Sequence, residues 1–164
     1  MTEQLYSEST RKILKNKKHI ENALKVKLSL KKGIFLIEGK PEDELIAEEV
    51  IEAMSLGFSV NQALDLKNEE FSFQKIPIKA ISHRNDLSQV RARIIGTHGK
   101  ALKNLEFLSG CDIVVHENYV GIIGHNEDVK KAVYALRKLI AGSKHANVYG
   151  YLEDENAKQK AGIW

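Results

Sequence analysis

The second half of the chain shows the clearer alternation of apolar and polar positions. From Gln74 to Ile81 the apolar residues fall at every second position, as is typical of a half-buried β-strand. Pro77 within this run lacks a backbone donor, so the strand is expected at the edge of its sheet. A helix should follow, with Ser88 as its N-cap and Ile95 near its end.

The order of elements continues with a second helix, which begins at Lys100. Two short apolar strands, 111–116 and 119–123, are separated by a turn. Apolar positions then recur on one helical face over 127–141. The predicted order is therefore strand, helix, helix, strand, strand and helix.

The first half of the chain repeats this order less distinctly. Gln4–Tyr6 is expected to be a shortened first strand, followed by two short helices. Alternation over 26–30 and an apolar run over 33–38 predict a β-hairpin. Pro41 then begins a helix with acids in its first turn, which suits the helix dipole. Since hairpin and helix recur about 85 residues later, we interpret the chain as an internal duplication.

This duplication predicts an α+β protein built from two tandem units of one type. The first unit, with a linker helix, is assigned to 1–70 and the second to 71–142. Residues 143–164 form a tail that is expected to be partly helical. Each unit should have a three-stranded sheet packed by three helices.

Charge is distributed unevenly between the halves. Residues 1–70 carry 11 Lys/Arg against 13 Asp/Glu, whereas 71–164 carry 14 against 9, a net charge of +5. Within the first half, 11–32 holds nine basic residues and one acid. Both basic zones suit a phosphate-bearing partner, although ordinary solvated surface explains either run equally well by itself.

Composition and residue spacing reduce the number of possible functional classes further. The single Cys111 excludes an internal disulfide and fits a reducing cytoplasm. The apolar stretches are too short to span a bilayer, and the N-terminus lacks the pattern of a signal peptide. The histidines show no metal-ligand spacing, and Glu106 is not part of a carboxylate cluster. We therefore expect a cytoplasmic protein that is not an enzyme and has no cofactor, metal or membrane partner.

The strongest chemical signal is Gly96-Thr97-His98-Gly99 between two helices. Glycines lack a Cβ, so the backbone can turn tightly and approach a ribose-phosphate chain closely. The helix that begins at Lys100 presents unpaired amides and the positive end of its dipole to a phosphate. A GxxG pattern alone is weak. Its position between two helices, ahead of a two-strand return, makes the signal specific.

This arrangement resembles the KH family of the type in which the hairpin and third helix follow the GxxG loop, type I. The likeness extends to the archaeal and eukaryotic partner-of-Nob-one family, also called the Dim-two type. That family has paired KH units joined by a Gly-Phe-Ser element like Gly57–Ser59, and the resemblance covers about 33–153. The matching segments are Arg91–Gly96, Tyr119–Gly124 and Gly142–Glu153.

The resemblance implies an assembly factor of the small ribosomal subunit. Such a factor binds single-stranded RNA in the 3′ region of the small-subunit ribosomal RNA precursor and supports its processing. The implied partners are the Nob-one-type endonuclease and the alpha subunit of translation initiation factor two. A GxxG loop clamps about four unpaired nucleotides. The predicted RNA-binding residues are Arg91, Arg93, Ile95, Gly96, Thr97, His98, Gly99, Lys100 and Lys103.

Several alternatives stay open at this point. The chain could be a protein–protein adaptor that docks the nuclease or the initiation factor, with RNA binding secondary. A third reading is a KH-type nuclease-complex cap or transcription factor. Those proteins usually carry an extra barrel domain, for which this sequence shows no pattern. His145 and Tyr149 either stack on RNA or pack the tail against the third helix.

The first unit departs from the family in its loop. The matching stretch, 14–18, contains no glycine. We therefore expect no close backbone approach to RNA there, and its lysines would attract phosphate only as point charges.

Overall fold

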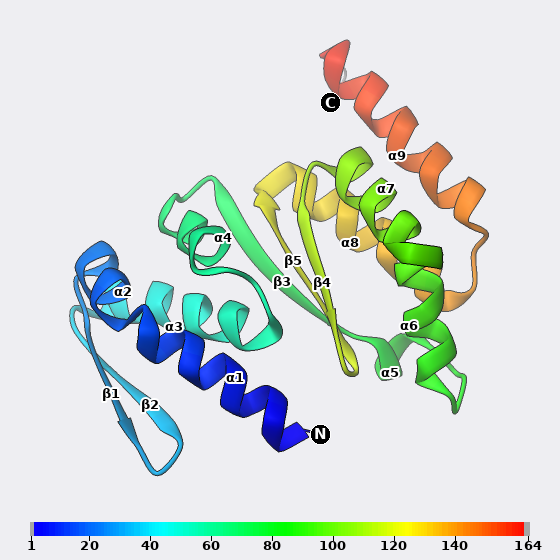
Figure 1. Cartoon of the computed structure of the whole chain (residues 1–164). Coiled ribbons are helices and arrows are strands. Elements are labelled where there is room, and N and C mark those ends of the chain that lie inside the picture. The colour runs from blue at the N-terminus through cyan, green and yellow to red at the C-terminus, as the bar shows by residue number, and fades with distance from the viewer. Residues whose placement is uncertain (1, 163–164) are drawn as a thin grey trace. The chain divides into compact units, whose positions relative to one another are not determined.

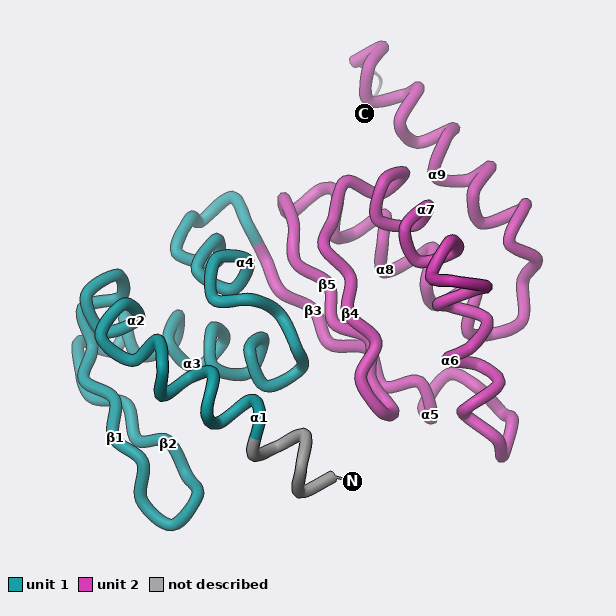
Figure 2. Tube along the Cα trace, viewed as in Figure 1, with its two compact units in different colours: residues 1–71 teal, residues 72–164 magenta. Residues whose placement is uncertain are grey.

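The computed structural model describes residues 2–162. The chain forms two compact units, residues 1–71 and 72–164 (Figure 2). Within the described residues, no helix is both long and apolar enough to cross a membrane.

The first unit is a β-hairpin packed by helices. Its sheet has two antiparallel strands among the described residues, and Leu28 lies opposite Ile37. The elements are α1 (Thr2–Lys15), α2 (Lys17–Leu24), β1 (Lys27–Lys31), β2 (Ile34–Glu38), α3 (Pro41–Leu56), α4 (Val60–Leu64) and a 3-10 turn (Asp65–Lys67).

The prediction of a first strand at Gln4–Tyr6 is wrong. These residues belong to α1, whose helical backbone continues to Lys15. Three residues are too few to separate strand from helix by periodicity, and the longer amphipathic segment that follows decides the outcome. The predicted three-stranded sheet of the first unit is therefore wrong as well. The order helix, helix, strand, strand and helix is observed.

The joining element Gly57-Phe58-Ser59 contributes to the core of the first unit. Gly57 ends α3 with a φ of 118°, which a side chain would strain. Phe58 is fully buried, and Ser59 caps α4 in a reciprocal capping box with Gln62. Lys12 donates to the Phe58 carbonyl over 3.1 Å, so this lysine of the basic zone also supports the fold.

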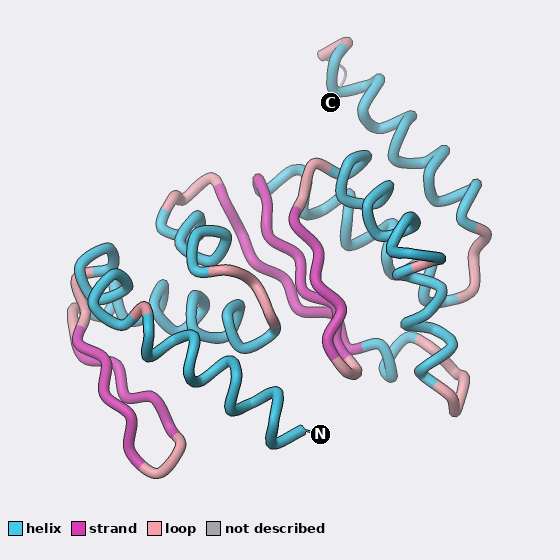
Figure 3. The backbone as a smooth tube through the Cα atoms, in the orientation of Figure 1, coloured by secondary structure: helices cyan, strands magenta, loops and turns pink. Residues whose placement is uncertain are grey.

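The second unit has the predicted order of strands and helices (Figure 3). Its sheet order is β3-β5-β4, and α6, α7 and α8 lie on one side of it (Figure 1). The elements are β3 (Phe71–Pro77), α5 (Ile78–Ile81), α6 (Leu87–Ile95), a 3-10 turn (Thr97–Gly99), α7 (Lys100–Ser109), β4 (Asp112–His116), β5 (Tyr119–His125), α8 (Asn126–Ala141) and α9 (His145–Lys160).

Two local predictions need correction. The strand predicted over 74–81 is an edge strand as expected, but it ends at Pro77 and continues as the short helix α5. The amide of Ile78 donates to the Asn118 carbonyl over 2.8 Å, which turns the chain away from the ladder. The N-cap of α6 is Asp86, because its carboxylate accepts from the Ser88 amide over 3.0 Å.

Helix α9 is packed onto α7 and α8 rather than extending into solvent. Val148 and Leu152 of α9 are buried in the apolar core of the unit. Lys131 of α8, whose side chain is 5% exposed, donates to Asn156 and Gln159 of α9 over 3.2 and 2.8 Å. Asn156 in turn donates to the Leu108 carbonyl at the end of α7 over 2.8 Å. These buried polar contacts make α9 part of the folded unit.

Cys111 lies in this core, and burial raises the pKa of its thiol to about 12. Because the thiolate is the reactive species, we expect no labelling of the native protein by a disulfide reagent at pH 8. Protein unfolded in urea should react within the mixing time. Native labelling at the rate of the unfolded chain would contradict this burial.

Candidate nucleic-acid interface

The Gly96–Gly99 loop joins two helices that meet at a sharp turn. Helix α6 ends at Ile95, and α7 begins at Lys100. Gly96, His98 and Gly99 have φ values of 74°, 54° and 74°. A non-glycine residue seldom adopts the left-handed region that His98 occupies between the two glycines. The loop therefore presents its backbone in one unusual, defined conformation.

The two glycines are required for different reasons. A Cβ on Gly96 would lie 2.6 Å from the Ala101 Cβ and 2.8 Å from the Ala101 amide nitrogen. Gly96 also combines its positive φ with a ψ of 177°, a region that essentially only glycine occupies. A Cβ on Gly99 would meet no atom within 4 Å, and its left-handed conformation is one that other residues tolerate at a cost.

This difference predicts unequal stability effects. Gly96→Ala should lower the free energy of unfolding by about 3 kcal/mol, because backbone strain adds to a steric clash. Gly99→Ala should cost about 1 kcal/mol through left-handed strain alone. Urea denaturation followed by circular dichroism measures both. Equal losses would show that the contact between Gly96 and Ala101 does not restrict the loop.

The surroundings of the loop are electropositive. Helix α7 has ten residues and no acid in its first turn, so its unpaired amides and positive dipole end are not neutralised by the helix itself. Lys100 and Lys103 are exposed on α7, and Thr97 and His98 are exposed at the loop tip. This is an anion-binding arrangement built from backbone and side-chain donors.

The two isoleucines at the end of α6 divide between core and surface. Ile94 is fully buried, whereas Ile95 is 36% exposed beside the loop. Arg91 lies four residues before Ile95 and therefore on the same helical face. Its guanidinium donates to the Glu117 carbonyl over 3.0 Å and to the Asn118 side chain over 3.3 Å, which ties α6 to the β4–β5 turn. Arg91 and Ile95 thus line one face with the loop.

Arg93 points away from that face. Its guanidinium donates to the Leu139 carbonyl over 2.9 Å and to the Ser143 carbonyl over 2.5 Å. His145 contacts the Arg93 carbonyl through Nε2 at 2.8 Å. The structure therefore connects α6 to the α8–α9 junction through Arg93. Of the two readings of His145 and Tyr149, these contacts favour packing of the tail.

Acidic groups near the loop have structural partners. Glu106 accepts from the Ile113 amide over 3.3 Å and links α7 to β4. Burial raises the pKa of Glu106, and Asp112 adds to the effect, while the Ile113 hydrogen bond opposes it. Among the side chains that the structure describes, no three His, Cys, Asp or Glu residues are grouped to hold a metal ion.

In the first unit, the stretch that matches the GxxG loop is a break between α1 and α2. Asn16 alone separates the two helices, and its side-chain Nδ2 donates to the Lys12 carbonyl over 2.8 Å. Lys15 and Lys18 are exposed, and Lys17 is half-buried. The turn brings charge to the surface without a glycine.

The comparison with known families adds to this geometry. The family model for the second KH domain of PNO1, described as a eukaryotic-type KH domain (KH domain type I), matches residues 72–157, just over half of the chain. The chain belongs to the PNO1 family of KH-domain proteins. The resemblance seen in the sequence is confirmed, and the GxxG loop lies inside the matched region.

Relatives of known name support this membership. A KH domain-containing protein of Methanocaldococcus jannaschii is 35% identical over 151 residues, 88% of this chain and 66% of the relative. The pre-rRNA-processing protein pno1 of Aspergillus oryzae is 30% identical over 117 residues, 69% of this chain and 45% of the relative. This PNO1-family chain therefore spans about half to two thirds of the relatives it matches.

A solved structure is similar over most of both chains. This neighbour is a protein chain in the crystal structure of the a/eIF2alpha–aDim2p–rRNA complex from Pyrococcus horikoshii OT3. It has a TM-score of 0.79 and 31% identity, and the match covers 88% of this chain and 84% of that one. The PNO1-type KH fold of the second unit is thus shown, within a mixed α and β chain.

Sequence reasoning missed the structural contacts of three residues of the second unit. Arg93 was assigned to RNA, but the structure shows its contacts with α8. Lys131 and Asn156 had no motif to mark them, since their partners lie 25 and 48 residues away along the chain. The sequence contains one signal for Lys131: it is a lysine at an apolar-facing position of the predicted helix 127–141.

Proposed function

We propose that this chain binds single-stranded RNA through α6, the GxxG loop and α7, and acts in small ribosomal subunit assembly. The observation that carries this proposal is the exposed Gly96–Gly99 loop at the amide end of a helix without acids in its first turn. KH modules use such a loop to clamp about four backbone nucleotides.

The names of the relatives support the biological setting. The A. oryzae relative is a pre-rRNA-processing protein, and the P. horikoshii neighbour was crystallised with ribosomal RNA and a/eIF2alpha. We infer that the RNA target is the 3′ region of the small-subunit ribosomal RNA precursor. The proposed protein partners are the Nob-one-type endonuclease and the alpha subunit of initiation factor two. The protein would work in the cytoplasm as a binding factor, not as an enzyme.

The proposed contact set follows the geometry of the second unit. Arg93 is best left out of it, because its guanidinium already donates to two carbonyls and supports the end of α8. The proposed contacts are Arg91, Ile95, Gly96, Thr97, His98, Gly99, Lys100 and Lys103. We assign the first unit as a degenerate KH domain that contributes charge and a packing or protein-binding face.

Fluorescence anisotropy with a fragment from the 3′ end of small-subunit ribosomal RNA tests this function. We expect tight binding that weakens as salt rises, with a log–log slope of roughly −0.7 for each phosphate neutralised. A double-stranded version should bind weakly, because a KH groove reads unpaired bases.

The adaptor function predicts a different outcome. The initiation-factor alpha subunit would bind in a pull-down while the RNA fragment would not bind at any salt concentration. That result would replace RNA binding with adaptor activity. Incubation with RNA and Mg²⁺ should leave the RNA intact, and cleavage that follows the protein through purification would make it an enzyme.

A further inference from the structure

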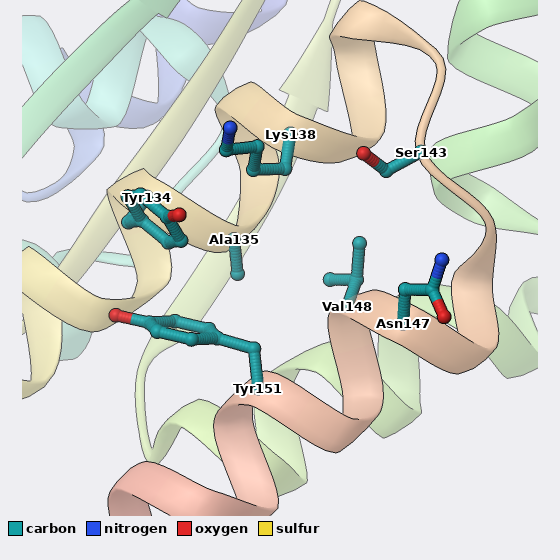
Figure 4. Close-up of a pocket in the computed structure, with 7 residues that line it drawn as sticks. All are labelled: Tyr134, Ala135, Lys138, Ser143, Asn147, Val148 and Tyr151. Atoms are coloured by element: carbon teal, nitrogen blue, oxygen red, sulfur yellow. The ribbon is translucent and has the colours of Figure 1, made fainter.

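A pocket opens between α8 and α9, outside the loop face described above. Its volume is about 190 Å³, and Figure 4 shows the side chains around it. Tyr134 and Lys138 come from α8, Ser143 from the connection, and Asn147 and Tyr151 from α9. Small apolar side chains form the remaining wall. The pocket is therefore built by the docking of α9 onto α8.

The lining combines aromatic surface with a cation. The rings of Tyr134 and Tyr151 lie 4.5 Å apart between centroids and are tilted by 45°. Tyr134 is 48% exposed, so part of its surface is open to a ligand. The Lys138 ammonium lies 5.5 Å from the centroid of the Tyr134 ring. An aromatic wall beside an ammonium suits a flat ring that carries a phosphate.

Charge is distributed unevenly around the pocket. Arg137 and Lys144 are exposed at neighbouring positions of the sequence, and no carboxylate is among the described residues that line the pocket. The nearest acid along this face of α9 is Glu155, one turn beyond Tyr151, and Lys158 pairs with it over 3.3 Å. A phosphate would therefore be attracted to the Lys138 end.

The pocket is also connected to the RNA-binding loop. Ser143 at its edge accepts from Arg93, and Arg93 stands three residues before Gly96 on the last turn of α6. His145, which begins α9, contacts the Arg93 carbonyl at 2.8 Å. The Ser143 end of the pocket is thus linked through Arg93 to the last turn of α6, which leads into the loop.

We propose that this pocket holds one further nucleotide of the RNA strand bound by the GxxG loop. The base lies against Tyr134 and Tyr151, and its phosphate pairs with Lys138. The pocket combines two rings, one ammonium and two polar side chains, and Arg93 links it to α6. These features favour RNA over a peptide as the occupant. The inference rests on the proposed function and extends it from the loop to the α8–α9 junction.

Two RNAs separate this inference from the function on which it rests. One is a six-nucleotide fragment that fills the loop site, and the other contains the same six nucleotides with three more at each end. Anisotropy should show that the full-length wild-type chain binds the longer RNA about tenfold more tightly, as expected for one stacked base and one phosphate contact. Tyr134→Leu and Lys138→Gln should each remove most of this gain and leave the short RNA unaffected.

Matched controls lie elsewhere on the same unit. Lys130→Gln removes an exposed charge of α8 outside the pocket, and Tyr119→Leu removes an exposed ring on β5. Both controls should keep the length-dependent gain. Photocrosslinking with 4-thiouridine in the flanks should label a peptide that contains Tyr134 or Tyr151.

Each outcome decides between the two claims. If the pocket variants keep the full gain, or weaken both RNAs equally, the pocket does not hold a nucleotide, while loop binding stands. If the wild-type protein binds both RNAs with the same affinity, the pocket proposal fails while the proposed function stands. If neither RNA binds, the proposed function fails and this inference fails with it.

Discussion

Replacement of Thr97 and His98 together by Asp should reduce affinity for single-stranded RNA at least about 100-fold, while the protein stays folded. Both side chains are exposed at the loop tip, so the change removes no core contact. Two carboxylates would face the phosphate at the amide end of α7 and reverse the favourable electrostatics. Anisotropy with the 3′ ribosomal RNA fragment measures the loss.

A neutral pair of substitutions provides the matched control. Thr97→Asn with His98→Asn has nearly the same shape as the Asp pair, and Asn accepts the left-handed conformation required at residue 98. This variant should lose little affinity. Equal affinity of the Asp variant and wild type would remove the GxxG loop from the binding site, and an equal loss in both variants would attribute the effect to shape.

A large stability effect is expected at the buried lysine between α8 and α9. Lys131 lies 3.1 Å from Asp128, and their side chains are 5% and 19% exposed. Asp128→Asn removes a carboxylate partner of the buried ammonium and should lower the free energy of unfolding by about 3 kcal/mol. Lys131→Met removes the charge together with its desolvation cost, so its loss should be clearly smaller.

Urea denaturation at neutral pH compares the two variants directly. The informative result is which variant loses more free energy of unfolding. We expect the larger loss for Asp128→Asn, although Asp128 is the more exposed partner. A larger loss for Lys131→Met would mean that the contacts with Asn156 and Gln159, rather than the ion pair, hold α9 in place. Because these contacts also support the pocket wall, either variant that loosens α9 should diminish the gain from longer RNA.

Local periodicity was sufficient for most of the second unit. Two helices around a glycine loop, a hairpin and a third helix each carry their own signal within a short stretch of chain. The same signals failed at Gln4–Tyr6, where three alternating residues proved to be the start of α1. They also misplaced the end of β3, because a hydrogen bond from Ile78 to Asn118 across the fold ends the strand.

By itself, the sequence determined the loop, its glycines and the family, since these depend on neighbouring residues. The direction in which each polar side chain points was decided only by the tertiary structure. Arg91 and Arg93 are two residues apart on one helix, yet one reaches the β4–β5 turn and the other reaches Leu139, 46 residues away. Such pairings depend on which helix faces meet, and apolar packing along the whole unit sets those faces. The pocket between α8 and α9 has the same origin, because Tyr134 and Tyr151 come together only when α9 docks.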